Sequence, residues 1–210
     1  MFMVDHVGAV FFSLDCVLVR GRTLTHVVEE RLGLRASTTA AEPDDARPDA
    51  ARWAGVSEDA LRASLEDFAP LPGVRETTDW CWRSGLVPVA LFLTWTPIAA
   101  HLADRFGFHS YSGRPLEVRS GHFTGRATAP VRVMTQREFA VRRADELGVP
   151  LTDCAAVGAC PADGPLLDVV GIGIAFNAPD DVRALATTAV DGDDLRTIIP
   201  ALERLAARTR

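Results

Sequence analysis

Short apolar runs recur along the chain, and the segments between them have the spacing of amphipathic helices. The runs are HVGAVFFSL from His6, LVPVALFL from Leu86, CAAVGA from Cys154 and GIGIAF from Gly171. Strands that alternate with helices predict a doubly wound α/β fold, a parallel sheet with helices on both faces. In such a sheet ligands bind beyond the carboxyl ends of the strands. We therefore expect the functional loops to be SLDCV, LTWTP and GACPAD.

Local signals mark two helices and one hairpin. Thr96 followed by Pro97 predicts an N-cap and a first helical residue, with Gly107 as the end of that helix. Thr135 with Glu138 predicts a capping box at the start of the next helix. The segment LEVRSGHFTGRAT alternates around Ser120 and Gly121, as a β-hairpin does.

An insertion with helical patterns separates the first strand from the second. Its helical segments are LTHVVEERLGL and SEDALRASLEDF, and between them lies RASTTAAEPDDARPDAA, which has few large apolar residues. This middle part is expected to be a mobile loop or a frayed helix. The chain is thus predicted to have an α/β core formed by residues 1–22 and 69–210 and a small helical cap formed by residues 23–68.

Composition narrows the classes of partner. The 210 residues carry a formal charge of -6 and a pI near 5.4, which argues against a nucleic-acid surface. No run approaches the roughly 18 apolar residues of a membrane span, and Asp5 and His6 interrupt the N-terminus before a signal-peptide core can form. We expect a cytoplasmic protein with a small-molecule or protein partner.

Cysteine and lysine usage limits the chemistry. Cys16, Cys81, Cys154 and Cys160 have no CxxC spacing, so a disulfide framework or a zinc ribbon is not expected. Cys16 and Cys160 lie in two loops of the same expected cleft, where they would be buried thiols, a redox pair or, with Asp15, a soft metal site. The chain has no lysine, which excludes a lysine Schiff base.

The loops SLDCV, LTWTP and GACPAD, in this order, resemble those of the haloacid dehalogenase (HAD) superfamily, in particular its phosphoserine-phosphatase-like branch with a small helical cap. The resemblance extends over nearly the whole chain and implies a Rossmann-like core. The phosphatases of this family use an aspartate nucleophile, a second aspartate as acid and base, a Mg²⁺ ion held by carboxylates, and a hydroxyl and a lysine that bind the phosphoryl oxygens.

Carried over position by position, the resemblance places Ser13 on the nucleophile and Asp15 on the acid and base. Phe92 falls on the phosphate-binding hydroxyl, although a shift of two residues would offer Thr94. Gln136 falls on the lysine, with Arg137 next to it.

In the last loop, Ala159 falls on the metal-binding aspartate and Ala162 on the phosphate-binding asparagine, and only Asp163 matches the family's pattern. Arg22 stands where the family's cap glutamate receives the substrate ammonium, which disfavours phosphoserine as a substrate. Two of three expected Mg²⁺ contacts, at positions 13 and 159, are therefore absent, and no resident metal is expected.

The sequence thus favours a repurposed, metal-independent enzyme or a pseudo-enzyme that binds a small organic ligand between core and cap. Asp15 and Asp163, with Ser13, are the candidate catalytic residues, and Arg22, Phe92, Thr94, Trp95, Gln136, Arg137 and Cys160 are candidate ligand contacts. Both aspartates are also interpretable as structural groups. The all-arginine, alanine-rich composition favours a GC-rich bacterial source and a role in secondary metabolism.

Two alternatives stay open. One is a residual phosphatase for a small phosphate monoester, which would use Mg²⁺ and in which Asp15 or Ser13, with Arg137, would substitute for the lost groups. The other is a non-catalytic interaction or regulatory module, which predicts a contiguous exposed apolar patch on the cap.

Overall fold

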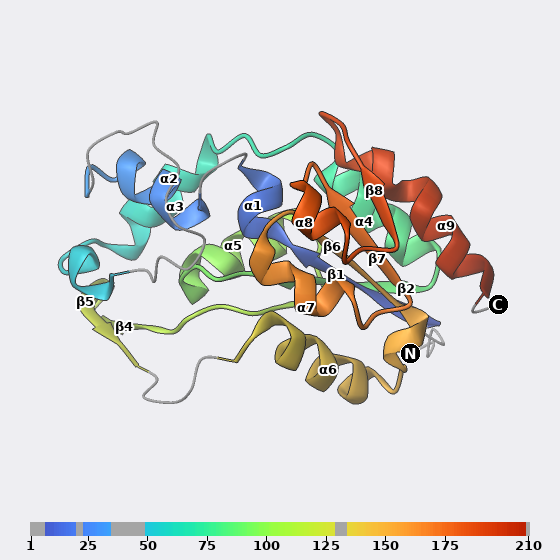
Figure 1. Ribbon diagram of the computed structural model, residues 1–210. Coiled ribbons are helices and arrows are strands. Elements are labelled where there is room, and N and C mark those ends of the chain that lie inside the picture. Colours follow the sequence, from blue (N-terminus) through green and yellow to red (C-terminus); the bar gives the residue numbers. More distant parts are fainter. Residues whose placement is uncertain (1–6, 20–22, 35–48, 129–133, 209–210) are drawn as a thin grey trace.

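The fold is a three-layer α/β/α sandwich, seen in a computed structural model that describes residues 7–19, 23–34, 49–128 and 134–208 (Figure 1). The six strands of the main sheet are all parallel and lie in the order β3-β2-β1-β6-β7-β8. They are β3 (Ser110–Tyr111), β2 (Leu86–Leu91), β1 (Gly8–Ser13), β6 (Cys154–Gly158), β7 (Ile172–Phe176) and β8 (Thr188–Val190). The predicted doubly wound parallel sheet is confirmed, and four of these strands are the predicted apolar runs.

Alternate residues of β1 face different helical layers, as the two-residue repeat of a strand requires. Val10 and Phe12 belong to a core shared with α4 (Val74–Arg83), α5 (Thr96–Phe106) and α9 (Ile199–Arg208). Ala9 and Phe11 belong to a second core shared with α6 (Gln136–Leu147) and α7 (Gly164–Leu167). Because both faces are covered, the strands of the centre are apolar throughout.

The remaining helices are short. They are α1 (Leu14–Leu18), α8 (Asp180–Arg183) and the 3-10 helices η2 (Leu151–Asp153), η3 (Pro161–Asp163) and η4 (Leu195–Ile198). In the described ranges no helix has both the length and the apolar character that crossing a membrane demands.

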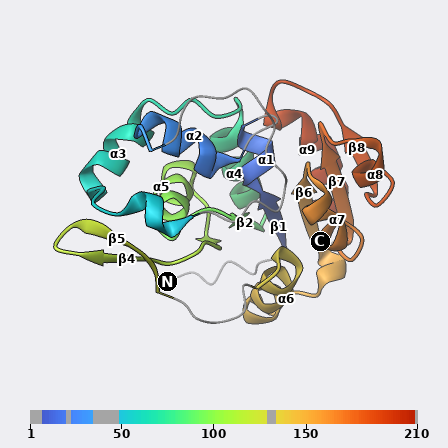
Figure 2. The ribbon, with the colours of Figure 1, turned by 60° about the vertical axis from the view of Figure 1, so that its left-hand side comes forward.

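The described part of residues 23–68 forms α2 (Leu24–Arg31), η1 (Ala50–Trp53) and α3 (Glu58–Glu66). Together with the hairpin of β4 (Leu116–Arg119) and β5 (His122–Ala127), these helices lie beyond the carboxyl end of β1, at the opposite end of the molecule from α9 (Figures 1 and 2). Trp53 packs edge-on against Phe123, so the hairpin is joined to the predicted cap. Most of the predicted mobile segment, residues 35–48, lies outside the described residues.

The local signals were read correctly with one exception. Thr135 and Glu138 form the predicted capping box, and the hairpin turns at Ser120 and Gly121, both with positive φ. The predicted N-cap at Thr96 is wrong by one residue. Trp95 takes the extended N-cap conformation, and its carbonyl accepts the first helical hydrogen bonds from Ile98 and Ala99. Thr96 is already helical, and its N–H donates outward to the Arg114 carbonyl.

Candidate functional site

Polar side chains from four elements meet at the carboxyl edge of the sheet. Ser13 ends β1, Asp15 lies in α1, Gln136 begins α6 and Asp163 ends η3. Their exposed fractions are 1% for Ser13, 3% for Asp15, 6% for Gln136 and 1% for Asp163. Buried polar groups of this kind are stable only when they are hydrogen-bonded, so their partners determine what the site can do.

Three of these side chains form one chain of hydrogen bonds. The Gln136 amide Nε2 donates to Ser13 Oγ at 2.9 Å, and Ser13 Oγ donates to Asp163 Oδ1 at 2.6 Å. Ser13 occupies the N-cap position of α1, where serine is favoured, yet its hydroxyl makes no capping hydrogen bond because it is used in this chain. The side chain at position 13 is therefore engaged both as donor and as acceptor.

Asp163 is held on its other oxygen by its own loop. Oδ2 accepts hydrogen bonds from the backbone N–H of Ala159 at 2.8 Å and of Cys160 at 3.0 Å, and from the Cys160 thiol at 3.4 Å. Gly158 allows this close approach, since a Cβ there would lie 2.5 Å from the Asp163 Cβ. Burial raises the pKa of Asp163, and the hydrogen bonds from Ser13, Cys160 and Ala159 act in the opposite direction.

Asp15 has a less complete set of donors. Its Oδ2 accepts from the Leu93 backbone N–H at 2.6 Å. Burial raises the pKa of Asp15 from 3.8 to about 6, the negative charge of Asp163 adds to the rise, and the backbone hydrogen bonds of Leu93 and Leu24 oppose it. A carboxyl group with a pKa near neutrality can both take up and release a proton under physiological conditions.

The loop after β2 packs into the core and contacts α2. Phe92 is 3% exposed, and its backbone is held by the Ser112 hydroxyl. Thr94 is fully buried and accepts a hydrogen bond of 2.7 Å from Thr25 of α2. Trp95 is 2% exposed and belongs to the larger core cluster. The Thr25–Thr94 hydrogen bond thus joins the predicted cap to the core at the residue that follows Leu93, the donor to Asp15.

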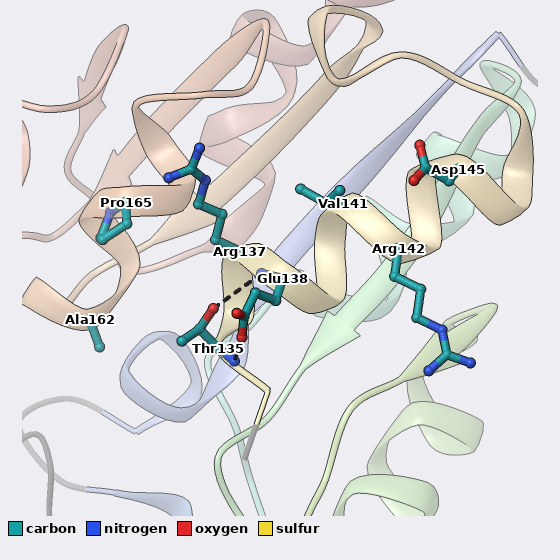
Figure 3. Close-up of a pocket in the computed structure, with 8 residues that line it drawn as sticks. All are labelled: Thr135, Arg137, Glu138, Val141, Arg142, Asp145, Ala162 and Pro165. Atoms are coloured by element: carbon teal, nitrogen blue, oxygen red, sulfur yellow. Dashed lines mark hydrogen bonds between the residues drawn. The ribbon is translucent and has the colours of Figure 1, made fainter. Parts of the chain in front are cut away.

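The remaining residues that were predicted to contact the ligand do not all lie in the buried cluster. Cys160 is buried against Asp163, whereas Arg137 is exposed and lines a surface hollow of about 610 Å³ between α6 and α7 (Figure 3). Ala162, on the predicted phosphate-binding position, lines the same hollow. Arg137 and Ala162 therefore lie outside the buried cluster, and Arg22 lies outside the described residues.

The cysteines are not in disulfides. Burial raises the pKa of Cys81 to about 12 and that of Cys154 to about 11, which makes these two thiols unreactive at neutral pH.

The residues at this edge do not fit a Mg²⁺ ion, which needs several free oxygen ligands. Both oxygens of Asp163 already accept hydrogen bonds, Ser13 is neutral and engaged, and position 159 carries a methyl group. Across the described ranges, no three or more His, Cys, Asp or Glu side chains are grouped so as to hold a metal ion.

Sequence reasoning did not identify several contributors to the site. They are the Leu93 backbone, Thr25 and Arg114, whose charge lowers the pKa of Asp15. A backbone donor leaves no mark on residue type, and Arg114 precedes the predicted hairpin LEVRSGHFTGRAT without belonging to any predicted motif. Thr25 is one of several buried polar residues of α2, together with His26 and Glu29, so residue type alone does not single it out.

Sequence comparison finds relatives among phosphoserine phosphatases. The chain is 31% identical over 147 residues to a phosphoserine phosphatase from Streptomyces coelicolor, covering 70% of this chain and 36% of that protein. It is 32% identical over 129 residues to a phosphoserine phosphatase from Lactococcus lactis, covering 60% of this chain and 56% of that protein. The chain thus spans only part of the length of the curated relatives that it matches. No protein-family model matches the chain.

Solved structures share the fold at low sequence identity. A substrate-bound phosphoserine phosphatase has a TM-score of 0.75 and 20% identity, covering 92% of this chain and 97% of that chain. A HAD family hydrolase from Salmonella enterica has a TM-score of 0.73 and 19% identity, covering 88% of this chain and 67% of that chain. In sequence the chain is thus similar to phosphoserine phosphatases, and it shares its fold with a solved phosphoserine phosphatase and a hydrolase of the haloacid dehalogenase (HAD) family.

Proposed function

We propose that this chain does not hydrolyse phosphate monoesters through an aspartyl-phosphate and Mg²⁺. Instead it binds a small organic ligand between the strand ends and the predicted cap, and Asp15 exchanges a proton with that ligand without a resident metal. The single observation that carries the proposal is a contrast between two side chains at one edge of the sheet. The Ser13 hydroxyl is engaged in hydrogen bonds both as donor and as acceptor, whereas the Asp15 carboxyl group has a pKa near 6.

The first support is the state of position 13. A nucleophile needs a free lone pair and a base that removes its proton. Ser13 donates a hydrogen bond to Asp163 and accepts one from Gln136, whereas the resemblance implies an aspartate nucleophile at this position in active relatives. A neutral hydroxyl that is held by hydrogen bonds in both directions is less suited to attack phosphorus than an anionic carboxylate.

The second support is the set of groups that would bind a phosphoryl group. The resemblance implies a hydroxyl at position 92 and a lysine at position 136, both of which would bind the phosphoryl oxygens. This chain has Phe92 and Gln136 at these positions. Loss of one oxyanion donor typically slows a reaction by about 100- to 1000-fold. Several concurrent losses would abolish phosphoryl transfer by the family's route.

The mechanism that remains is general acid and base catalysis by Asp15. The Leu93 N–H fixes the orientation of the carboxyl group, and burial, with a further contribution from the charge of Asp163, keeps the pKa of Asp15 raised. Proton transfer by such a group supports cyclisation, dehydration or isomerisation of an organic molecule. In this proposal Asp163 supports Asp15 through its charge, and the ligand enters when the cap moves and breaks the Thr25–Thr94 hydrogen bond.

Different observations bear on the two alternatives, the residual phosphatase and the non-catalytic interaction module. The names of the relatives favour a residual phosphatase, and that alternative is decided by assay. An interaction module would present an apolar patch on the cap, but the large hydrophobic residues that are exposed, Trp82, Tyr111, Val118, Met134 and Leu185, all lie outside residues 23–34 and 49–68, the described part of the cap.

The test is phosphate release from p-nitrophenyl phosphate and O-phospho-L-serine, with and without Mg²⁺, alongside calorimetric titration with Mg²⁺. We expect neither turnover nor binding, with an active phosphoserine phosphatase as the positive control. The Asp15→Asn and Asp59→Asn variants are assayed under the same conditions. Asp59→Asn is the matched control, because the Asp59 side chain is 89% exposed. Mg²⁺-dependent turnover that disappears in Asp15→Asn but persists in Asp59→Asn would contradict the proposal and restore a phosphatase.

A further inference from the structure

The Gln136 side chain is hydrogen-bonded at only one of its two polar atoms. Nε2 donates to Ser13, whereas Oε1 is buried and accepts no hydrogen bond from the described residues. Burying a carbonyl oxygen without a donor leaves its lost hydration uncompensated, so such atoms are uncommon in folded proteins.

The neighbouring groups determine which end of the amide is unpaired. Asp163 receives four hydrogen bonds, three of them on Oδ2, and so acts as the acceptor of the Ser13 proton. With its proton committed, Ser13 can only accept from Gln136, and only the Nε2 end of the amide donates. The carbonyl Oε1 is therefore the unpaired end.

The charges at this edge disfavour an anion next to that oxygen. Asp163 carries its charge at the centre of the cluster, and Asp15 lies close enough for its pKa to be raised by that charge. The positive charge of Arg114 is among the main causes that lower the pKa of Asp15. No cation is among the main causes that act on the pKa of Asp163. A phosphate group would thus meet carboxylates and a carbonyl oxygen rather than donors.

We infer that Gln136 Oε1 is the acceptor of a ligand subsite beside Ser13 and Asp163, which takes an N–H or O–H donor of a neutral or cationic small molecule and rejects phosphate esters. This inference rests on the proposed function, because it names the ligand class of the same site. The resemblance implies a lysine at this position that binds the anionic phosphoryl group. In this chain the Gln136 carbonyl would instead accept a hydrogen bond from the ligand.

The composition of the chain makes a direct test possible. Gln136 is the only glutamine and Asn177 the only asparagine. The Asn177 side chain is exposed and its amide is paired at both ends with the backbone of Gly192. A protein labelled with ¹³C and ¹⁵N therefore gives one carboxamide signal from the proposed subsite and one from a paired control.

The probes are ethylammonium and acetamide as donors and inorganic phosphate as the anion, titrated into the full chain. We expect the donor probes to shift the Gln136 Cδ signal and leave Asn177 unchanged, with no response to phosphate. A Gln136 Nε2 response to phosphate would show that the hydrogen-bond chain runs the other way, and would overturn the inference. No response to any probe, as for a carbonyl already bonded to internal water, would overturn it as well.

A variant separates binding from folding. In a thermal-shift titration with ethylammonium, the Gln136→Leu variant is expected to lose the stabilisation seen in the unaltered protein, and Asn177→Gly is expected to keep it. If Gln136→Leu does not fold, the spectra of the unaltered protein still decide the question. Mg²⁺-dependent phosphatase activity would defeat the proposed function, whereas silence of the Gln136 signal without such activity would defeat only this inference.

Discussion

Two loops at the same edge of the sheet each bury an aspartate, and they differ in how completely the carboxyl group is hydrogen-bonded. In the loop after β6, Asp163 accepts from Ser13, from two backbone N–H groups and from a thiol. In the loop after β1, Asp15 accepts a short hydrogen bond from Leu93 and is influenced by the Leu24 backbone. Burial raises the pKa of both carboxyl groups.

This difference indicates a division of roles. A carboxylate with four donors holds its loop in place, because every donor would be left unpaired without it. A buried carboxyl group with few donors and a pKa near 6 makes the fold less stable at neutral pH, but it is suited to exchange protons. We therefore propose a structural role for Asp163 and proton transfer for Asp15.

The largest expected effect is that of Asp163→Ala. The substitution leaves the Ala159 and Cys160 N–H groups and the Ser13 hydroxyl without their acceptor, and each buried donor without a partner costs about 1–3 kcal/mol. We expect the free energy of unfolding to fall by about 3–5 kcal/mol in urea denaturation. Asp168→Ala is the control, since Asp168 is exposed, and a similar loss in both variants would remove the structural role of Asp163.

The second effect is a pH dependence caused by Asp15. Because the pKa of Asp15 is about 6 in the folded protein and 3.8 in the unfolded reference, the folded state binds the proton more tightly. Its contribution to stability is complete below about pH 4 and is lost as the pH rises through about 6, by about 3 kcal/mol. Urea denaturation at several pH values should show this loss relative to Asp15→Asn, and a difference that stays constant from pH 4 to 7 would exclude the assigned pKa.

The smallest effects come from the side-chain donors to Asp163. Ser13→Ala removes a 2.6 Å hydrogen bond and also leaves Gln136 Nε2 unpaired, so we expect a loss of about 1–3 kcal/mol. Cys160→Ala removes a 3.4 Å contact from a weak thiol donor and should cost less than Ser13→Ala. Thermal denaturation of the two variants gives the order, and the reverse order would mean that the Gln136–Ser13–Asp163 chain does not hold the loop.

The sequence was most informative where burial is continuous. The strands that end at Ser13, Leu91, Gly158 and Phe176 all lie within the predicted apolar runs, because a parallel strand covered on both faces needs apolar residues throughout. The strands β3 and β8 were not predicted. They have two and three residues at the sheet edges, and such short segments lack a periodic signal.

The sequence predicted which strand ends carry the polar residues of the candidate site, but not the hydrogen bonds between them or the contributions of the Leu93 backbone, Thr25 and Arg114. Strand ends and loop order brought Ser13, Asp15, Gln136 and Asp163 together correctly, because the carboxyl ends of parallel strands meet at one edge. The hydrogen bond between Ser13 and Asp163, which are 150 residues apart, depends on side-chain directions that no local pattern encodes. The same limit applies to Arg137, which is one residue from Gln136 but lies on the exposed side of α6.

The most direct test of the division between the two aspartates is ¹³C NMR titration of the side-chain carboxyl groups, with the Asp15 signal assigned by its loss in Asp15→Asn. The account predicts that the Asp15 carboxyl titrates with a midpoint of about 6 in the folded protein. A midpoint at or below about 4, the ordinary range of an aspartate, would contradict it and would make Asp15 a second structural carboxylate.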